Sequence, residues 1–116
     1  MQSKWGASMG LYAEPEKIGF YLDDGFPMLS LSGMTDVMRM ANYFARTTLY
    51  QWQTVSKNGG HVTSASGLTL VPDAALGELK KVDRFIVVSE TDFKFDDAEV
   101  SAWLRLNERQ GTAIGS

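Results

Sequence analysis

The pattern of hydrophobic and polar positions predicts that strands and helices alternate along this chain. An apolar run over residues 18–22 ends at a turn-forming Asp-Asp-Gly sequence and indicates a first strand. A helix follows, with Ser30 or Ser32 as its expected N-cap and its end near Arg46. Its apolar residues recur at intervals of three and four, the spacing of one helix face: Leu31, Met34, Val37, Met38, Ala41 and Phe44.

The middle of the chain predicts a second strand and a hairpin-like excursion. Alternation over residues 50–56 indicates the strand, and an Asn-Gly-Gly turn signal at residues 58–60 leads into residues 61–65. Ser-Gly at residues 66–67 breaks the chain again. Pro and Asp then begin a segment over residues 72–79 that we expect to be a short helix.

The last third of the chain predicts a strand, a helix and another strand. Residues 83–89 have the near-continuous apolar content of a parallel strand that is covered on both faces. Asp96 and Asp97 favour a helix N-terminus, and Gly111 favours its end. Residues 112–115 then read as a final strand. This order implies a parallel sheet with a right-handed crossover, and the inner face of the helix is expected to carry Val100, Trp103 and Leu104.

Composition restricts the chemistry that these 116 residues can carry. The formal net charge of −3 argues against binding of a phosphate backbone by this segment. The sequence has no cysteine, which excludes disulfides, thiolate metal sites and a cysteine nucleophile within these residues. A single histidine, His61, argues against a zinc cluster. We therefore expect neither a metal ion nor any other cofactor.

No export or membrane segment is visible in the sequence. The first 17 residues lack the apolar stretch of a signal peptide, and the longest strongly apolar run, residues 85–88, is far short of the ~20 residues that span a bilayer. We expect a soluble, cytoplasmic protein without a membrane partner. Residues 1–16 show no periodicity and are predicted to be a flexible N-terminal extension, and residues 17–116 are expected to form the N-terminal part of one domain.

Five segments occur in an order and at a spacing that together point to a known family. They are residues 18–26, 36–42, 49–52, 67–73 and 85–88. In this arrangement the chain, from residue 18 to its end, resembles the N-terminal sensor domain of GlxA-type AraC-family transcriptional regulators. That domain belongs to the class I glutamine amidotransferase-like superfamily, which includes the ThiJ/PfpI proteins. The resemblance implies an α/β, flavodoxin-like three-layer sandwich with a mostly parallel sheet, incomplete at the C-terminus.

The resemblance also bears on catalysis. It matches residues 112–115 to the strand that leads to the nucleophile elbow, where enzymatic members of the superfamily carry a reactive cysteine. The sequence ends before that position, and Ser116 has neither a following helix nor a base, so we expect no catalytic residue. A sheet that ended here would leave an apolar flank and unpaired edges. We therefore expect a homo-oligomer or a complementing chain.

Asp36 is the first candidate for ligand binding. The resemblance matches it to a helix position where many relatives carry glutamate. One interpretation is a carboxylate at the mouth of a pocket, accepting hydrogen bonds from a cationic or amide-bearing ligand. The other is a solvated acid early in a helix, favoured there by the helix dipole. The sequence leaves both interpretations open.

The remaining candidates lie where strands end. Phe26 and Pro27 follow the first strand and either line a ligand pocket or pack under the first helix. Ser89 and Glu90 lie at the end of the strand predicted for residues 83–89, where enzymatic relatives place small glycines whose amides form an oxyanion hole. For Glu90, together with Asp92, a polar loop is the alternative that we favour. Asn42 is expected to serve helix packing or capping.

Two functions from different classes follow from the resemblance. The first is a non-catalytic, effector-sensing and dimerising domain of an AraC-family regulator. Its effector would be a small nitrogenous metabolite, such as a betaine-like compound or arginine, and it would bind DNA only through a helix-turn-helix domain absent from this chain. The alternative is the N-terminal half of a ThiJ/PfpI-type cysteine hydrolase or amidotransferase-like enzyme. The residues encoded after Ser116 would distinguish the two.

Overall fold

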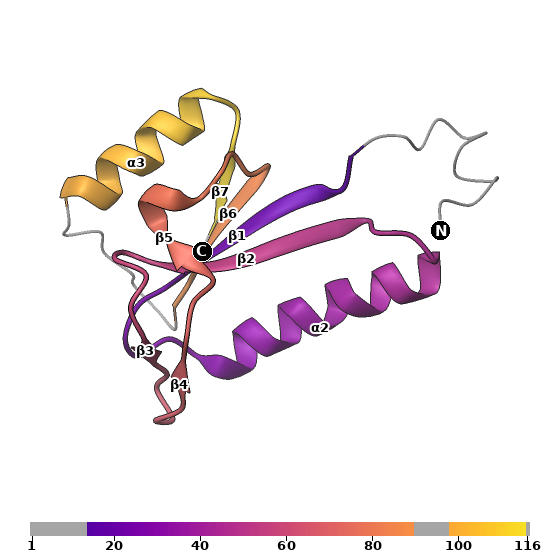
Figure 1. Cartoon of the computed structure of the whole chain (residues 1–116), viewed down its shortest axis with the longest axis horizontal. Coiled ribbons are helices and arrows are strands. Elements are labelled where there is room, and N and C mark those ends of the chain that lie inside the picture. The colour runs from indigo at the N-terminus through magenta and orange to yellow at the C-terminus, as the bar shows by residue number, and fades with distance from the viewer. Residues whose placement is uncertain (1–13, 90–97, 116) are drawn as a thin grey trace.

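The fold is organised around one five-stranded sheet. A computed structural model describes residues 14–89 and 98–115 of the chain. The strand order is β5-β2-β1-β6-β7, and all neighbours in this sheet pair in parallel (Figure 1). With the short β5 set aside, this is the order of a flavodoxin-like sheet. The strands are β1 (Glu16–Leu22), β2 (Tyr50–Ser56), β5 (Ala74–Ala75), β6 (Arg84–Val88) and β7 (Ala113–Gly115).

Helices cover both faces of the sheet and complete the three layers that the sequence predicts. In Figure 1, α2 (Met28–Ala45) lies below the sheet and α3 (Ala98–Arg109) lies above it. Side chains alternate between the two faces: Phe20 and Leu22 join the core under α2, whereas Tyr21 joins the core under α3. The predicted α/β fold is confirmed.

The helix α2 begins earlier than expected. Pro27 is its N-cap residue, with no side-chain cap, and the Ser32 hydroxyl donates to the Leu29 carbonyl inside the helix. The predicted N-cap at Ser30 or Ser32 is therefore wrong. Phe26 is buried, so the chain must turn directly after it, and the fixed φ of proline suits a helix start.

The predicted inner face of α2 is only half right. Leu31 is buried, and Met34 and Met38 pack against the core. Val37 and Phe44, however, are 66% and 73% exposed on the outer side. The helix carries apolar residues on two opposite sides. Because residues on both sides recur at intervals of three and four, the sequence pattern did not separate the two sides. The helix end is as expected, because Arg46 adopts the left-handed conformation with φ 56°.

The predicted hairpin pairs other residues than expected. β1 occupies one edge of β2, and β5 pairs on the other edge with Val55 and Ser56, where a hairpin after β2 would begin; residues 61–65 therefore do not pair with it. Instead β3 (Val62–Thr63) pairs antiparallel with β4 (Thr69–Leu70), and the Ser-Gly break at residues 66–67 lies in their connection. His61 is exposed beside β3.

The short helix predicted for residues 72–79 is mostly extended. The Asp73 carboxylate accepts hydrogen bonds from the Thr54 N–H (2.8 Å) and hydroxyl (3.1 Å), which holds this segment against β2. The chain therefore continues as β5, and only a single 3-10 turn, η1 (Leu76–Glu78), forms after it.

The last third agrees with the sequence pattern. β6 lies between β1 and β7, and Val100 and Leu104 of α3 are buried against it, as predicted. Trp103 packs on Phe85 with ring centroids 4.6 Å apart. The predicted helix start at residues 96–97 lies outside the described residues, as does most of the predicted extension, although β1 already begins at Glu16.

In the part of the chain that the structure describes, no helix has both the length and the apolar content needed to cross a membrane. The longer of the two α-helices within residues 14–89 and 98–115, α2, has 18 residues and contains serine, threonine, asparagine and two charged side chains.

Replacement of Phe85 should show how strongly the α3 side of the core holds the fold. Phe85 is fully buried between Tyr21 and Trp103. We expect Phe85→Ala to lower the free energy of unfolding by about 3–5 kcal/mol, measured by urea denaturation. Leu106→Ala, on the exposed side of α3, should change it by about 0.5 kcal/mol or less. Equal losses in the two variants would contradict this assignment of the core.

Candidate functional site

The strand order defines where a ligand site is expected. The chain moves from β1 to β2 on one side and from β6 to β7 on the other, so the order reverses between β1 and β6. Ligands of such sheets bind outside the carboxyl ends of the strands at this point. Leu22 and Val88 are the last paired residues of β1 and β6, and Asp23 and Ser89 follow them directly. We call the surface formed by residues 23–27 and Ser89 the switch-point edge.

The turn after β1 is fixed by the β3–β4 hairpin. The Asp24 carboxylate accepts a hydrogen bond from the Thr63 N–H (2.9 Å), and the Gly25 N–H donates to the Thr63 carbonyl (2.8 Å). A third bond joins the Ala65 N–H to the Phe26 carbonyl (2.9 Å). These bonds tie the first strand-to-helix turn to a segment almost 40 residues later, which gives the switch-point edge a defined shape.

Asp23 presents a carboxylate at this edge. Its Oδ1 accepts the N–H of Asp24 at 2.9 Å, and its side chain is exposed. The sequence pattern marked this residue only as part of a turn. The signal that could have identified it is an acid placed directly after the first strand, because the carboxyl ends of parallel strands face the ligand crevice.

Phe26 and Pro27 have different positions at this edge. Phe26 is 2% exposed and packs under α2 with Leu31, so it belongs to the core. Pro27 is half-buried at the start of α2, and the first turn of that helix has neither a side-chain cap nor an acidic residue. The first N–H groups of the helix, with the positive end of its dipole, therefore lie at the switch-point edge.

Ser89 lies at the switch-point edge, half-buried and directly after β6. Glu90, the other candidate on this connection, lies outside the described residues. Of the predicted ligand-binding residues, the structure thus brings Phe26, Pro27 and Ser89 to one edge of the sheet.

Asp36 does not join this group. It lies eight residues after Met28, about 12 Å along the axis of α2. Its side chain is 66% exposed, and its Oδ1 accepts a hydrogen bond from Arg39 Nε at 3.2 Å. The solvated interpretation of Asp36 fits this exposure, although the residue lies in the middle of the helix and not in its first turn.

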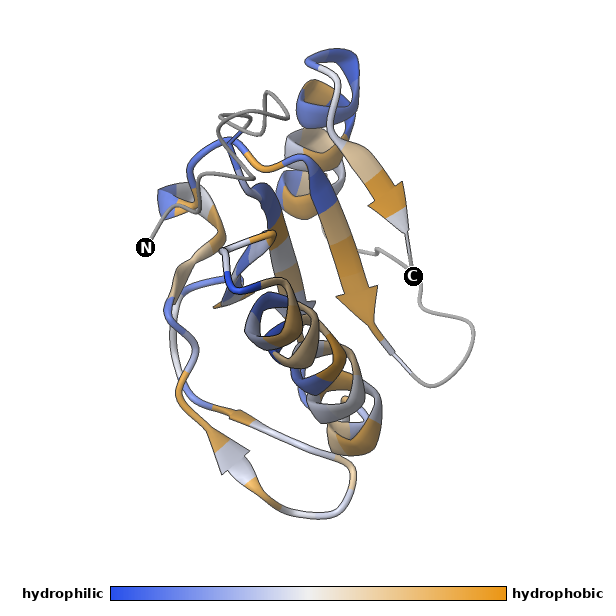
Figure 2. Ribbon diagram, turned by 90° about the vertical axis from the view of Figure 1, so that its right-hand side faces the viewer, coloured by the Kyte–Doolittle hydropathy of each residue, from blue (hydrophilic) through white to orange (hydrophobic). Residues whose placement is uncertain are grey.

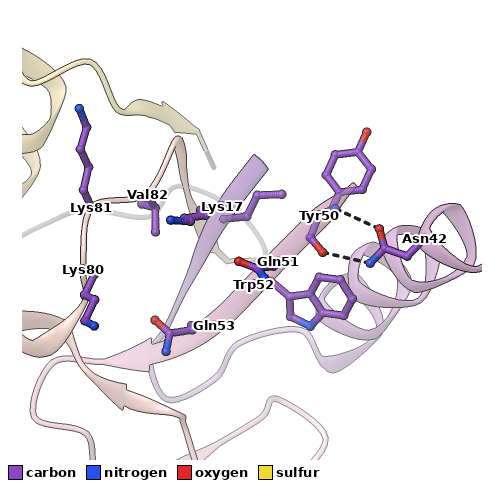
Figure 3. A pocket seen from close by; sticks show the side chains of 10 residues that line it. Lys17, Asn42, Tyr50, Gln51, Trp52, Gln53, Lys80, Lys81 and Val82 are labelled. Atoms are coloured by element: carbon purple, nitrogen blue, oxygen red, sulfur yellow. Dashed lines mark hydrogen bonds between the residues drawn. The ribbon is translucent and has the colours of Figure 1, made fainter. Parts of the chain in front are cut away.

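A hollow of about 590 Å3 lies at the amino ends of β1 and β2, away from the switch-point edge. Figure 3 shows its lining, with the side chains of Lys80 and Lys81 pointing in opposite directions. Asn42 has a structural role here: its Oδ1 accepts the N–H groups of Leu49 (2.8 Å) and Tyr50 (3.0 Å), and its Nδ2 donates to the Tyr50 carbonyl (3.0 Å). Asn42 thus attaches the end of α2 to the start of β2.

The described residues contain no group of three or more histidine, cysteine, aspartate or glutamate side chains that could hold a metal ion.

Comparison with known proteins connects this fold to a family, although no family model matches the chain. The chain is 34% identical over 103 residues to the HTH-type transcriptional regulator GbdR of Pseudomonas aeruginosa. It is 38% identical over 55 residues to the HTH-type transcriptional regulator GlxA of Rhizobium meliloti. These matches cover 88% and 47% of the chain but only 28% and 17% of the relatives. The chain therefore spans less than a third of the length of these regulators.

Comparison with solved structures also finds a transcriptional regulator among the similar proteins. A crystal structure of an AraC family transcriptional regulator from Pseudomonas putida superposes with a TM-score of 0.74 and 28% identity, covering 87% of this chain and 64% of that one. The chain is a homologue of the AraC-family regulators. A ThiJ/PfpI family protein from Pseudomonas syringae, with a TM-score of 0.67 and 22% identity over 98% of this chain and 47% of its own, shares the fold. The predicted resemblance is confirmed.

Asn42 offers a test of the attachment between α2 and β2. We expect Asn42→Ala to lower the free energy of unfolding by about 1–2 kcal/mol, because two N–H groups and one carbonyl lose their partner while alanine improves helix propensity. Asn42→Asp keeps the acceptor for both N–H groups and should lose less. Urea denaturation of both variants measures the difference, and an Asp variant as unstable as the Ala variant would contradict this role.

Proposed function

We propose that this chain is the effector-sensing and dimerising domain of an AraC-family transcriptional regulator and that it catalyses no reaction. The observation that carries the proposal is the match to HTH-type transcriptional regulators over 88% of the chain. The formal net charge of −3 supports a sensor that leaves DNA binding to another part of the protein. DNA binding would then belong to a separate domain of the whole protein.

The enzymatic alternative has weaker support. The similarity to the ThiJ/PfpI protein, at 22% identity, extends to the fold alone. The relatives with more than 30% identity are named transcriptional regulators. A fold shared by enzymes and binding domains does not decide function, so the closer sequence relationship has more weight here.

In this proposal the effector binds at the switch-point edge. The Asp23 carboxylate lies four residues before Pro27, where α2 begins with free N–H groups. A cationic nitrogen would pair with Asp23, and a carboxylate would accept from the helix start. This arrangement suits a small nitrogenous zwitterion, such as an amino acid or a betaine-like compound, with Ser89 beside it. Glu90, the next residue in the sequence, remains a candidate for the same site.

The position of the edge also suggests how binding would be transmitted. The turn that carries Asp23 is bonded to β3 through Thr63 and leads directly into α2. A ligand that contacts both the turn and the helix start would favour one arrangement of these two elements. In this proposal, effector binding is transmitted to the rest of the protein as a change in the position of α2.

Titration calorimetry of the 116-residue chain tests the proposed site. We expect arginine or a betaine-like zwitterion to bind, and the decarboxylated amine of arginine to bind at least about tenfold more weakly, because it lacks the group that accepts from α2. Asp23→Asn should weaken binding of the zwitterion about tenfold or more, since the negative charge opposite its cationic nitrogen is lost. Asp36→Asn, the matched control on α2, should change affinity by about twofold or less.

The two aspartate variants separate the possible outcomes. Both side chains are exposed, so circular dichroism should show an unchanged fold for each variant. Loss of binding in Asp36→Asn, with Asp23→Asn unaffected, would place the carboxylate on α2 instead. No heat change with any zwitterion would count against a sensor of this chemical class.

A further inference from the structure

The outer face of α2 is unusually apolar for a helix on the surface of the described chain. Five large side chains are exposed there: Leu29 (84%), Val37 (66%), Met40 (46%), Tyr43 (74%) and Phe44 (73%). Surface helices normally direct charged and polar residues outward. Positions 29, 33, 37, 40 and 44 follow one another at intervals of four and three, so they form one continuous line on the helix. We call this line, together with Tyr43, the outer stripe.

Charge on this helix is balanced. Asp36 and Arg39 are the only charged residues among the 18 of α2, and they pair with each other at 3.2 Å. The helix is therefore neutral although the chain has a formal net charge of −3. Two copies of this face would not repel each other, whereas a strongly charged partner would find little to attract it.

The outer stripe also has a gap and a neighbouring hollow. At Gly33 the line has no side chain, and an added Cβ would meet no atom within 4 Å. Beside it lies a hollow of about 380 Å3 lined by Gly33, Met34, Val37 and Met38, with Phe20 and Ile86 of the sheet below. Figure 2 shows the hydrophobic strand β6 next to α2 on this side. The face thus combines projecting apolar side chains with a hollow that is lined by apolar residues.

We propose that the outer stripe binds the outer stripe of a second copy of this chain, with the two α2 helices antiparallel around a two-fold axis near Asp36 and Val37. The proposal rests on the dimerising function proposed above and specifies its surface. The axis lies midway between the ends of the stripe, Leu29 and Phe44. In this register Leu29 faces the partner subunit's Phe44, and Gly33 faces the partner subunit's Met40.

Self-complementarity is the reason for choosing a second copy as the occupant. A two-fold axis requires the same patch to carry both the projection and the space that receives it. Met40 projects and Gly33 leaves room, and the axis brings each opposite the other, as a knob into a hole. Asp36 and Arg39 lie on one flank of the stripe, close enough to the axis for each to approach the opposite charge of the partner subunit.

The area is adequate for the centre of an interface. Aromatic side chains bury about 150–250 Å2 each, so Tyr43 and Phe44, about three quarters exposed, alone offer roughly 200–400 Å2. The largest apolar patch on a typical monomer covers about 300–600 Å2. A standard interface buries about 800 Å2 on each partner, which the remaining stripe residues, the hollow and the polar flanks would supply.

Analytical ultracentrifugation of the 116-residue chain tests the surface. We expect a dimer whose dissociation constant rises at least about tenfold in Val37→Lys, because a charged side chain would replace an apolar one within the buried stripe near the axis. The matched control is Leu106→Lys on the outer side of α3, where the leucine is 52% exposed, and it should leave the dimer unchanged. Both substitutions introduce the same exposed charge, and circular dichroism checks that each variant is folded.

Disulfide cross-linking tests the register, since the sequence has no cysteine of its own. A disulfide requires Cα atoms within about 7 Å. Val37→Cys lies near the proposed axis and should form a covalent dimer under mild oxidation. Tyr43→Cys lies on the same stripe but about 20 Å from its own copy in this register, so it should not. Leu106→Cys is the control away from α2.

The outcomes distinguish this inference from the proposed function. A monomer at high concentration would overturn the inference, as would a dimer that Val37→Lys does not weaken and Val37→Cys does not cross-link. Zwitterion binding by a monomeric Val37→Lys variant would support the proposed sensor function independently of the α2 interface. An intact dimer that binds no zwitterion would count against the sensor while supporting the α2 interface.

Discussion

The burial of β1 on both faces is the constraint on which the rest of the structure depends. β1 pairs with β2 along one edge and with β6 along the other, and Phe20 and Leu22 are fully buried. A parallel strand in this position needs a cover on each face, because its side chains alternate between them. α2 supplies one cover, and α3 with η1 supplies the other.

The same constraint positions the candidate site. Because Phe26 is drawn into the core directly after β1, the chain has only a few residues in which to turn, and these are polar. Asp24 is used to hold β3, which leaves Asp23 at the switch-point edge beside the start of α2. The acid and the helix start are thus neighbours for a reason that belongs to the fold.

α2 is the element whose composition the fold does not fully explain. Its inner side chains, Leu31, Met34 and Met38, are required to cover β1. Its outer stripe contributes nothing to that cover, yet it is as apolar as the inner face. The sequence suggested self-association through an incomplete sheet. The surface that we propose for self-association is instead the neutral outer face of α2. A sensor whose ligand contacts the start of α2 would have its proposed dimer surface on the same helix.

The sequence by itself determined the local elements, since periodicity reports on each segment alone: β1, β2, β6, the body of α2 and the buried side of α3 all follow from it. The order and spacing of its motifs indicated the resemblance to the AraC-family regulators. The sequence could not determine which partner a strand finds or which of two apolar helix faces turns inward. Residues 61–65 failed to pair with β2 because β5 already pairs with the end of that edge, and Val37 and Phe44 turned outward because Leu31 and Met38 faced β1. Asp23, and not Asp36, lies directly after β1 at the switch-point edge, because only the tertiary structure decides which acid lies where two parallel strands end.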